Sequence, residues 1–113
     1  MLFRSVVDAA GAYGNQTRAG SNPAVFSLHA TKSLGAGEGG FVVTTEPAFA
    51  TELRRLSNFG IDLSSGAVPS VGTNGKLSEY HAAVALAALD GWAARQHRRQ
   101  QLHRTYVDVL ARR

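Results

Sequence analysis

The sequence has no cysteine, one tryptophan and one methionine, and it contains no long hydrophobic run. The absence of cysteine excludes disulfide bonds and thiolate chemistry, which leaves histidine and carboxylate side chains as metal ligands. The longest apolar run, Ala82–Leu89, spans eight residues, well short of the ~18 that predict a membrane-spanning helix. Residues 1–8 also lack the apolar core of a secretory signal. We therefore expect a cytoplasmic chain that does not cross a membrane.

Acidic residues are scarce near the end of the sequence. Residues 92–113 contain six arginines and one acid, Asp108, whereas the other 91 residues carry a net charge of −1. Nucleic-acid binding would require stacking aromatics between these arginines, and Tyr106 is the only one between Arg95 and Arg113. A solvated helix face is the simpler interpretation, and we expect no nucleic-acid partner.

Short strand-like runs alternate with loops in the first half of the sequence. The runs are Leu2–Val7, Ala24–Phe26 and Phe41–Thr44. Residues 11–23 and 61–75 are rich in Gly, Ser, Asn and Pro and are expected to be loops. Residues 33–40 form a glycine-rich turn with no room for a helix.

A first helix is expected after the third strand. Thr45 is placed to cap a helix whose first turn contains Pro47. We expect this helix to run to about Phe59 and to stop at Gly60.

A second helical region is expected to begin after a cap at Ser78. Its first part, Ala82–Leu89, is apolar nearly all round and is therefore expected to be buried. Gly91 is costly inside a helix, so Asp90-Gly91 predicts a break. Beyond the break, apolar residues recur at helical spacing at Leu102, Tyr106 and Leu110. The sequence ends without a helix cap, which suggests truncation.

The segment Gly35–Gly40 matches the pattern G-x-G-x-x-G of dinucleotide-binding folds. In those folds a helix follows the pattern, and its N-terminus receives the pyrophosphate. Here a strand is expected to follow. We interpret the glycines as a tight connection that lets Lys32 and the next strand approach closely.

Lys32 is the only lysine in the first 75 residues, and it lies just past a strand among small residues. A lysine that forms an imine needs a partly enclosed setting of this kind. An ordinary exposed lysine explains the position equally well.

Two further side chains could contact a cofactor bound as an imine to Lys32. Asp8 ends a strand at the edge where α/β sheets place ligand contacts, and it could keep the ring nitrogen of pyridoxal 5'-phosphate (PLP) protonated. Ser27 ends the next strand and could bond a phosphate oxygen. Taken alone, Asp8 would more often cap a helix or form a turn, and Ser27 would bond local backbone.

The histidines do not predict a metal site. They lie at positions 29, 81, 97 and 103 and include no His-x₃-His pair. His29 is close enough in sequence to Lys32 to lie near a cofactor.

Several segments, in order, carry a resemblance to a known family. They are Asp8–Ala10, Phe26–Lys32, Gly37–Gly40, Arg55–Gly60, and Asn74–Glu79 with Ala82 and Ala83. Together they resemble the nucleotide-sugar aminotransferases of the DegT/StrS type, and the resemblance extends from Val6 to about Leu110. Its most specific part is Ser-x-His-Ala-Thr-Lys followed by Gly-Glu-Gly-Gly.

This resemblance implies an α/β fold of type I, PLP as cofactor, a homodimer, and transfer of an amino group, usually from glutamate, to a nucleotide-linked keto sugar. It implies that Lys32 forms the Schiff base and later moves the proton, that Asp8 pairs with the ring nitrogen, and that Ser27 contacts the phosphate. Asn74 resembles the asparagine that reaches this phosphate from the other subunit. Gly11 stands where the family commonly has Gln or His, so that contact to the ring oxygen has no assigned residue.

The family enzymes are several times longer, so we expect a piece of the PLP-binding large domain that lacks the N-terminal part and most of the C-terminal small domain. Residues 1–90 would belong to the large domain, and residues 91–113 to a helix leading toward the small domain. We expect the parent enzyme, not this piece alone, to act on a nucleotide sugar with an amino-acid donor.

Two alternatives remain. One is a PLP-dependent sugar dehydratase of the same fold, but such relatives carry histidine in place of Lys32. The other is a non-catalytic interaction module whose basic C-terminal helix binds an acidic partner.

Overall fold

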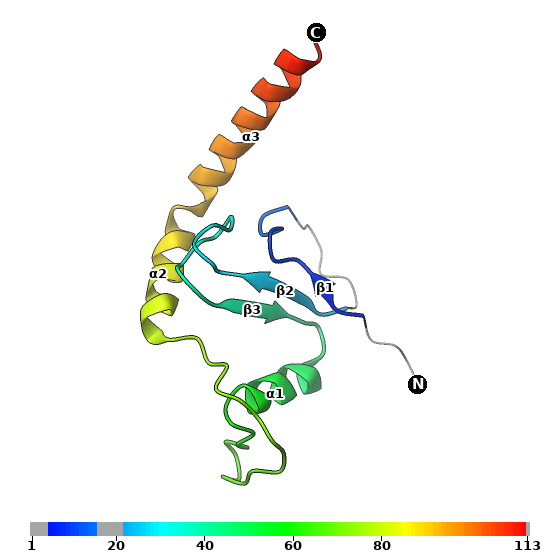
Figure 1. Cartoon of the computed structure of the whole chain (residues 1–113), viewed down its shortest axis with the longest axis vertical. Coiled ribbons are helices and arrows are strands. Elements are labelled where there is room, and N and C mark those ends of the chain that lie inside the picture. Colours follow the sequence, from blue (N-terminus) through cyan, green and yellow to red (C-terminus); the bar gives the residue numbers. More distant parts are fainter. Residues whose placement is uncertain (1–4, 16–21, 113) are drawn as a thin grey trace.

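The computed structural model describes residues 5–15 and 22–112. Three short strands precede three helices (Figure 1): β1 (Val7–Asp8), β2 (Ala24–Ser27), β3 (Gly40–Val43), α1 (Pro47–Leu56), α2 (Glu79–Asp90) and α3 (Trp92–Leu110). α2 lies beside the sheet, and α3 projects away from it (Figure 1). The molecule is therefore long and flat, with extents of 63, 38 and 17 Å. Among the described residues no helix is long and apolar enough to cross a membrane.

The strands form one mixed sheet in the order β1-β2-β3. β1 runs parallel to β2, with Asp8 opposite Val25. β2 and β3 are antiparallel, with Ser27 opposite Gly40. This direction follows from the short connection between them, because a parallel pair would need a crossover of a dozen or more residues.

The strand predictions are confirmed for β2 and β3, with ends that differ by one residue. Of the strand expected at Leu2–Val7, residues 2–4 lie outside the described part of the chain, and β1 contains only Val7 and Asp8. Residues 16–21 of the first expected loop also lie outside it. The second expected loop, 61–75, contains no helix or strand beyond one isolated bridge at Asn74.

The core consists of two small apolar clusters. One contains Leu28, Leu34, Ala36 and Ala85, and the other contains Ala9, Ala24 and Phe26. Tyr13 and Phe41 pack against both. Phe26 and Phe41 stack with ring centroids 5.0 Å apart, and Tyr13 meets each of them edge-on at 6.0 and 5.9 Å. Such aromatic pairs contribute about 0.5–1.5 kcal/mol each beyond the area they bury.

α1 begins with Pro47 as predicted, but both of its ends differ from expectation. The N-cap is Glu46, not Thr45, and it makes no side-chain capping bond. The helix ends at Leu56, three residues before the predicted end. Phe59 and Gly60 have φ values of 58° and 78°, a left-handed backbone that cannot continue a right-handed helix.

α2 begins as predicted but is less buried than predicted. The Ser78 hydroxyl accepts a hydrogen bond from the backbone N–H of His81 at 3.2 Å, and the break at Gly91 is present. The expected burial of Ala82–Leu89 is wrong, because Ala85 is its only buried residue and Leu86 is 65% exposed. Only one face of the helix meets the β2–β3 connection. The apolar residues at Leu102, Tyr106 and Leu110 are likewise exposed.

We predict that Gly35→Ala destabilises the protein by about 1–3 kcal/mol, the usual cost of overpacking. A Cβ at Gly35 would lie 2.5 Å from the carbonyl oxygen of Ala30, and backbone cannot rotate away as a side chain can. Gly91→Ala is the control, because there the nearest atom is the flexible end of Arg95, 4.0 Å away. Urea unfolding measures the stability of each variant, and Gly91→Ala should show no loss of unfolding free energy. A Gly35→Ala protein as stable as the parent would contradict this account of the turn.

Candidate functional site

Asp8 and Ser27 lie at one edge of the sheet. Because β1 and β2 are parallel, their carboxyl ends meet there. Asp8 is opposite Val25, and Ser27 is two residues beyond Val25, so the three side chains project from the same face. This face is opposite to that of the core residue Phe26, and Val25 is partly exposed on it. The sheet thus places a carboxylate and a hydroxyl on the same accessible face, at the same edge.

Both side chains are held by local backbone. Asp8 Oδ1 accepts a hydrogen bond from the N–H of Ala10 at 3.0 Å. Ser27 Oγ accepts one from the N–H of His29 at 3.1 Å. Each bond uses only part of the group, since a carboxylate has a second oxygen and a hydroxyl that accepts can still donate its hydrogen. The two groups are therefore oriented and still able to bind a ligand.

Lys32 lies in the turn that extends from the carboxyl end of β2. Its backbone N–H donates to the carbonyl of His29 at 2.9 Å, and its side chain is half-buried. Across the base of the turn, the N–H of Ala30 donates to the carbonyl of Gly37 at 2.8 Å. Within the described part of the chain, no hydrogen bond or ion pair occupies the Lys32 amine.

The turn of Lys32 is also joined to the loop that follows Asp8. The hydroxyl of Ser33, the next residue, donates to the carbonyl of Gly11 at 3.5 Å. This long contact links two segments 22 residues apart. The structure therefore brings the segments of Asp8, Ser27 and Lys32 together at one end of the sheet.

The side chain of His29 points toward other residues of the β2–β3 connection. Its Nδ1 lies 2.9 Å from Thr31 Oγ1, and its Nε2 lies 3.7 Å from Glu38 Oε1. These contacts brace the segment that carries Lys32. Among the residues that the structure describes, no group of three His, Asp and Glu side chains could hold a metal ion.

Asn74 is separate from these residues. It forms an isolated antiparallel bridge with Asn58, just beyond α1. The N–H of Thr73 donates to the carbonyl of Leu56 at 2.8 Å, and the N–H of Gly75 donates to that of Ser57 at 2.9 Å. Asn74 is exposed, and no contact within the described chain joins it to Asp8, Ser27 or Lys32. The structure therefore fixes its backbone without adding it to the site.

Arg55 holds the loop that precedes Asn74. Its Nη2 donates to Glu52 Oε1 at 2.5 Å, and its Nη1 donates to Ser70 Oγ at 2.5 Å. The hydrogen bond with Glu52 raises the pKa of Arg55, as does the negative charge of Asp62. Close packing of Gly72 on Gly60 completes this attachment, because a Cβ at Gly72 would lie 2.1 Å from the nitrogen of Gly60.

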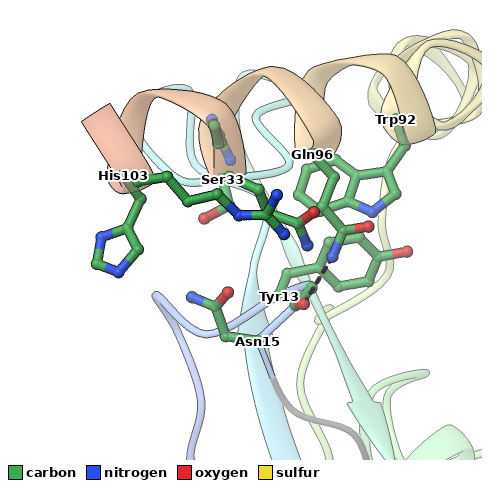
Figure 2. Close-up of a pocket in the computed structure, with 10 residues that line it drawn as sticks. Tyr13, Asn15, Ser33, Trp92, Gln96 and His103 are labelled. Atoms are coloured by element: carbon green, nitrogen blue, oxygen red, sulfur yellow. Dashed lines mark hydrogen bonds between the residues drawn. The ribbon is translucent and has the colours of Figure 1, made fainter. Parts of the chain in front are cut away.

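A cavity of about 750 Å³ lies between the loop after β1 and α3 (Figure 2). It is lined by Tyr13, Gly14, Asn15, Ser33, Trp92, Gln96, Arg99, Gln100, His103 and Arg104. Gln96 Nε2 donates to the carbonyl of Gly14 at 2.8 Å across it. The sequence interpretation missed this cavity and assigned the arginines to a solvated helix face. No local pattern signals a contact between residues 82 positions apart.

Comparison with solved structures defines the class. The chain is similar to a structure described as a PLP-dependent aminotransferase from Bacillus cereus, with a TM-score of 0.85 and 31% identity over 94% of this chain and 30% of that one. The mixed sheet and helices thus match part of a chain described as a PLP-dependent aminotransferase.

Sequence comparison gives the family. The model of the DegT/DnrJ/EryC1/StrS aminotransferase family matches residues 3–113, and the chain belongs to this family. It is 44% identical to the erythromycin biosynthesis sensory transduction protein EryC1 of Saccharopolyspora erythraea, over 92% of this chain and 30% of that protein. It is 42% identical to dTDP-3-amino-3,4,6-trideoxy-alpha-D-glucose transaminase of Streptomyces venezuelae, over 94% of this chain and 29% of the relative.

We predict that Arg55→Gln loosens the segment that carries Asn74. The variant loses the charged bonds to Glu52 and Ser70, so the amides of Thr73 and Gly75 should exchange hydrogen faster. Arg54→Gln is the matched control, because Arg54 is exposed on the same turn of α1 and its side chain makes no such bond to this loop. Hydrogen exchange with mass analysis measures both variants. Equal exchange in the two would show that Arg55 does not hold the segment.

Proposed function

We propose that these residues form part of the active site of a PLP-dependent enzyme that transfers an amino group, with glutamate as donor, to a nucleotide-linked keto sugar. The observation that carries the proposal is the meeting of Asp8, Ser27 and the Lys32 turn at one end of the sheet. Family membership supports transamination. The similarity to the Streptomyces relative, a dTDP-sugar transaminase by name, supports the substrate class.

The side chains at this edge fit the cofactor by their chemistry. When bound, PLP supplies an aldehyde carbon and a ring that accepts electrons. Asp8 would hold a proton on the ring nitrogen, and Ser27 would donate its hydroxyl hydrogen to a phosphate oxygen. Lys32 would hold the cofactor by condensing its amine with the aldehyde, with release of water, and the same amine would serve to carry a proton during the transfer.

Asn74 is assigned to the partner subunit's site in this proposal. Its side chain would reach the cofactor phosphate across a homodimer interface. Its exposure supports this role, since a residue that serves a partner must project from its own subunit. Residues 1–90 would then belong to the large domain, and residues 91–113 would lead toward a small domain, in a cytoplasmic enzyme.

Two observations disfavour the alternatives. Lys32 argues against the sugar dehydratase, because dehydratases of this fold carry histidine in place of this lysine. The interaction module assigns α3 to binding an acidic partner, with no part in the proposed site. The bond from Gln96 to Gly14 and the edge-on contact of Trp92 with Tyr13 at 4.8 Å tie α3 to the loop that follows Asp8.

We predict that Lys32→Arg abolishes turnover in the full-length enzyme, because the variant keeps the charge but loses the nucleophilic amine. The matched control is Lys76→Arg, since Lys76 Nζ donates to Asn58 Oδ1 at 3.0 Å and lies over the Phe59 ring. The control should remain active. Borohydride reduction and peptide mass mapping should place the pyridoxyl group on Lys32. An adduct on another lysine, or an active Lys32→Arg enzyme, would refute the proposal.

We further predict that inactive Lys32→Ala and impaired Asn74→Ala subunits complement each other. A mixed dimer would contain one site with both lesions and one with neither, so random reassortment should restore roughly a quarter of the parent activity. Mixing Lys32→Ala with Lys32→Arg subunits is the control and should restore nothing. If mixed dimers form without recovery, Asn74 does not act across the interface.

A further inference from the structure

The cavity beside α3 has a basic and polar lining. Among the residues that the structure describes, Arg99, His103 and Arg104 supply its titratable groups besides Tyr13, and no acidic residue lines it. Its other polar groups include the side chains of Asn15, Ser33, Gln96 and Gln100. Figure 2 shows Tyr13 and Asn15 of the loop facing Trp92, Gln96 and His103 of the helix. Its volume falls within the roughly 300–1,000 Å³ of small-molecule sites.

The walls of the cavity are fixed by contacts at one end. Gln96 bonds the carbonyl of Gly14, and Tyr13 meets Trp92 edge-on. The Arg99 guanidinium lies 5.6 Å from the Trp92 ring centroid, a contact that restricts the side chain while leaving its N–H groups free to donate. The loop and the helix are therefore held apart at a set spacing.

The two arginines are not neutralised by the described residues. Neither forms an ion pair with them, although Asp108 lies one helical turn beyond Arg104. Two unpaired guanidinium groups beside a polar cavity attract an anion, and their forked donors match phosphate oxygens especially well. A carboxylate alone would fill little of this volume.

We propose that this cavity binds the phosphate groups of a small-molecule ligand through Arg99 and Arg104. Ser33, which follows Lys32 in the turn, lines the same cavity, so the ligand would lie next to the turn that carries the proposed reactive amine. The diphosphate of the nucleotide sugar is the source that fits, and this identification rests on the proposed function. Inorganic diphosphate shares the chemistry, and the experiment separates the two.

The test is calorimetric titration of the full-length protein with thymidine diphosphate, inorganic diphosphate and thymidine. Arg99→Gln and Arg104→Gln should each weaken thymidine diphosphate binding about tenfold, the effect of one lost charge-assisted hydrogen bond. Arg98→Gln is the matched control, because Arg98 lies on the same helix but does not line the cavity. Arg104 makes no contact with Trp92, so its variant tests the site even if Arg99→Gln misfolds. Tighter binding of thymidine diphosphate than of inorganic diphosphate identifies the nucleotide as the source.

Three results would overturn the site: unchanged binding in both variants, an equal loss in Arg98→Gln, or another segment of the full-length chain filling the cavity. Equal binding of both diphosphates would overturn the nucleotide assignment alone. Failure of the proposed function is separable, because it appears as turnover in Lys32→Arg while phosphate binding still depends on Arg99 and Arg104. Conversely, an inactive Lys32→Arg protein that binds thymidine diphosphate independently of both arginines rejects only this site.

Discussion

The close approach of two backbone segments in the β2–β3 connection is the constraint on which the site depends. Gly35 lies against the carbonyl of Ala30 with no room for a side chain. The chain therefore reverses within a few residues, pairs β3 with β2 and holds Lys32 in the turn. The same connection presents Leu28, Leu34 and Ala36 to Ala85 of α2. One tight turn thus positions Lys32, completes the sheet and provides the surface on which a helix packs.

Local chemistry was enough to predict most elements from the sequence. The cap at Ser78 and the break at Gly91 depend on a few neighbouring residues and were predicted correctly. The end of α1 was not, because Phe59 adopts a left-handed backbone that no propensity favours for an aromatic residue. Burial of α2 was overestimated for a different reason. Apolar composition indicates that a helix can be buried, but not how much of its surface the described chain covers.

The candidate site shows the same division. Residue type and position at strand ends pointed to Asp8, Ser27 and Lys32, while the contact between Ser33 and Gly11 that joins their segments required the structure. The cavity beside α3 could not have been predicted, since its walls come from opposite ends of the chain. The helical pattern predicted that Arg99 and Arg104 are solvated, whereas in the structure they line this cavity together with residues of the loop after β1. The role of Asn74 depends on a second subunit and remains a prediction.

Trp92, the only tryptophan of these 113 residues, lies where α3 meets the loop after β1. Its ring is 4.8 Å from that of Tyr13 and 5.6 Å from the Arg99 guanidinium. At such separations an excited tyrosine passes its energy to the indole, and a nearby cation changes the colour of the emitted light. The fluorescence of Trp92 therefore reports whether α3 stays packed against the loop after β1.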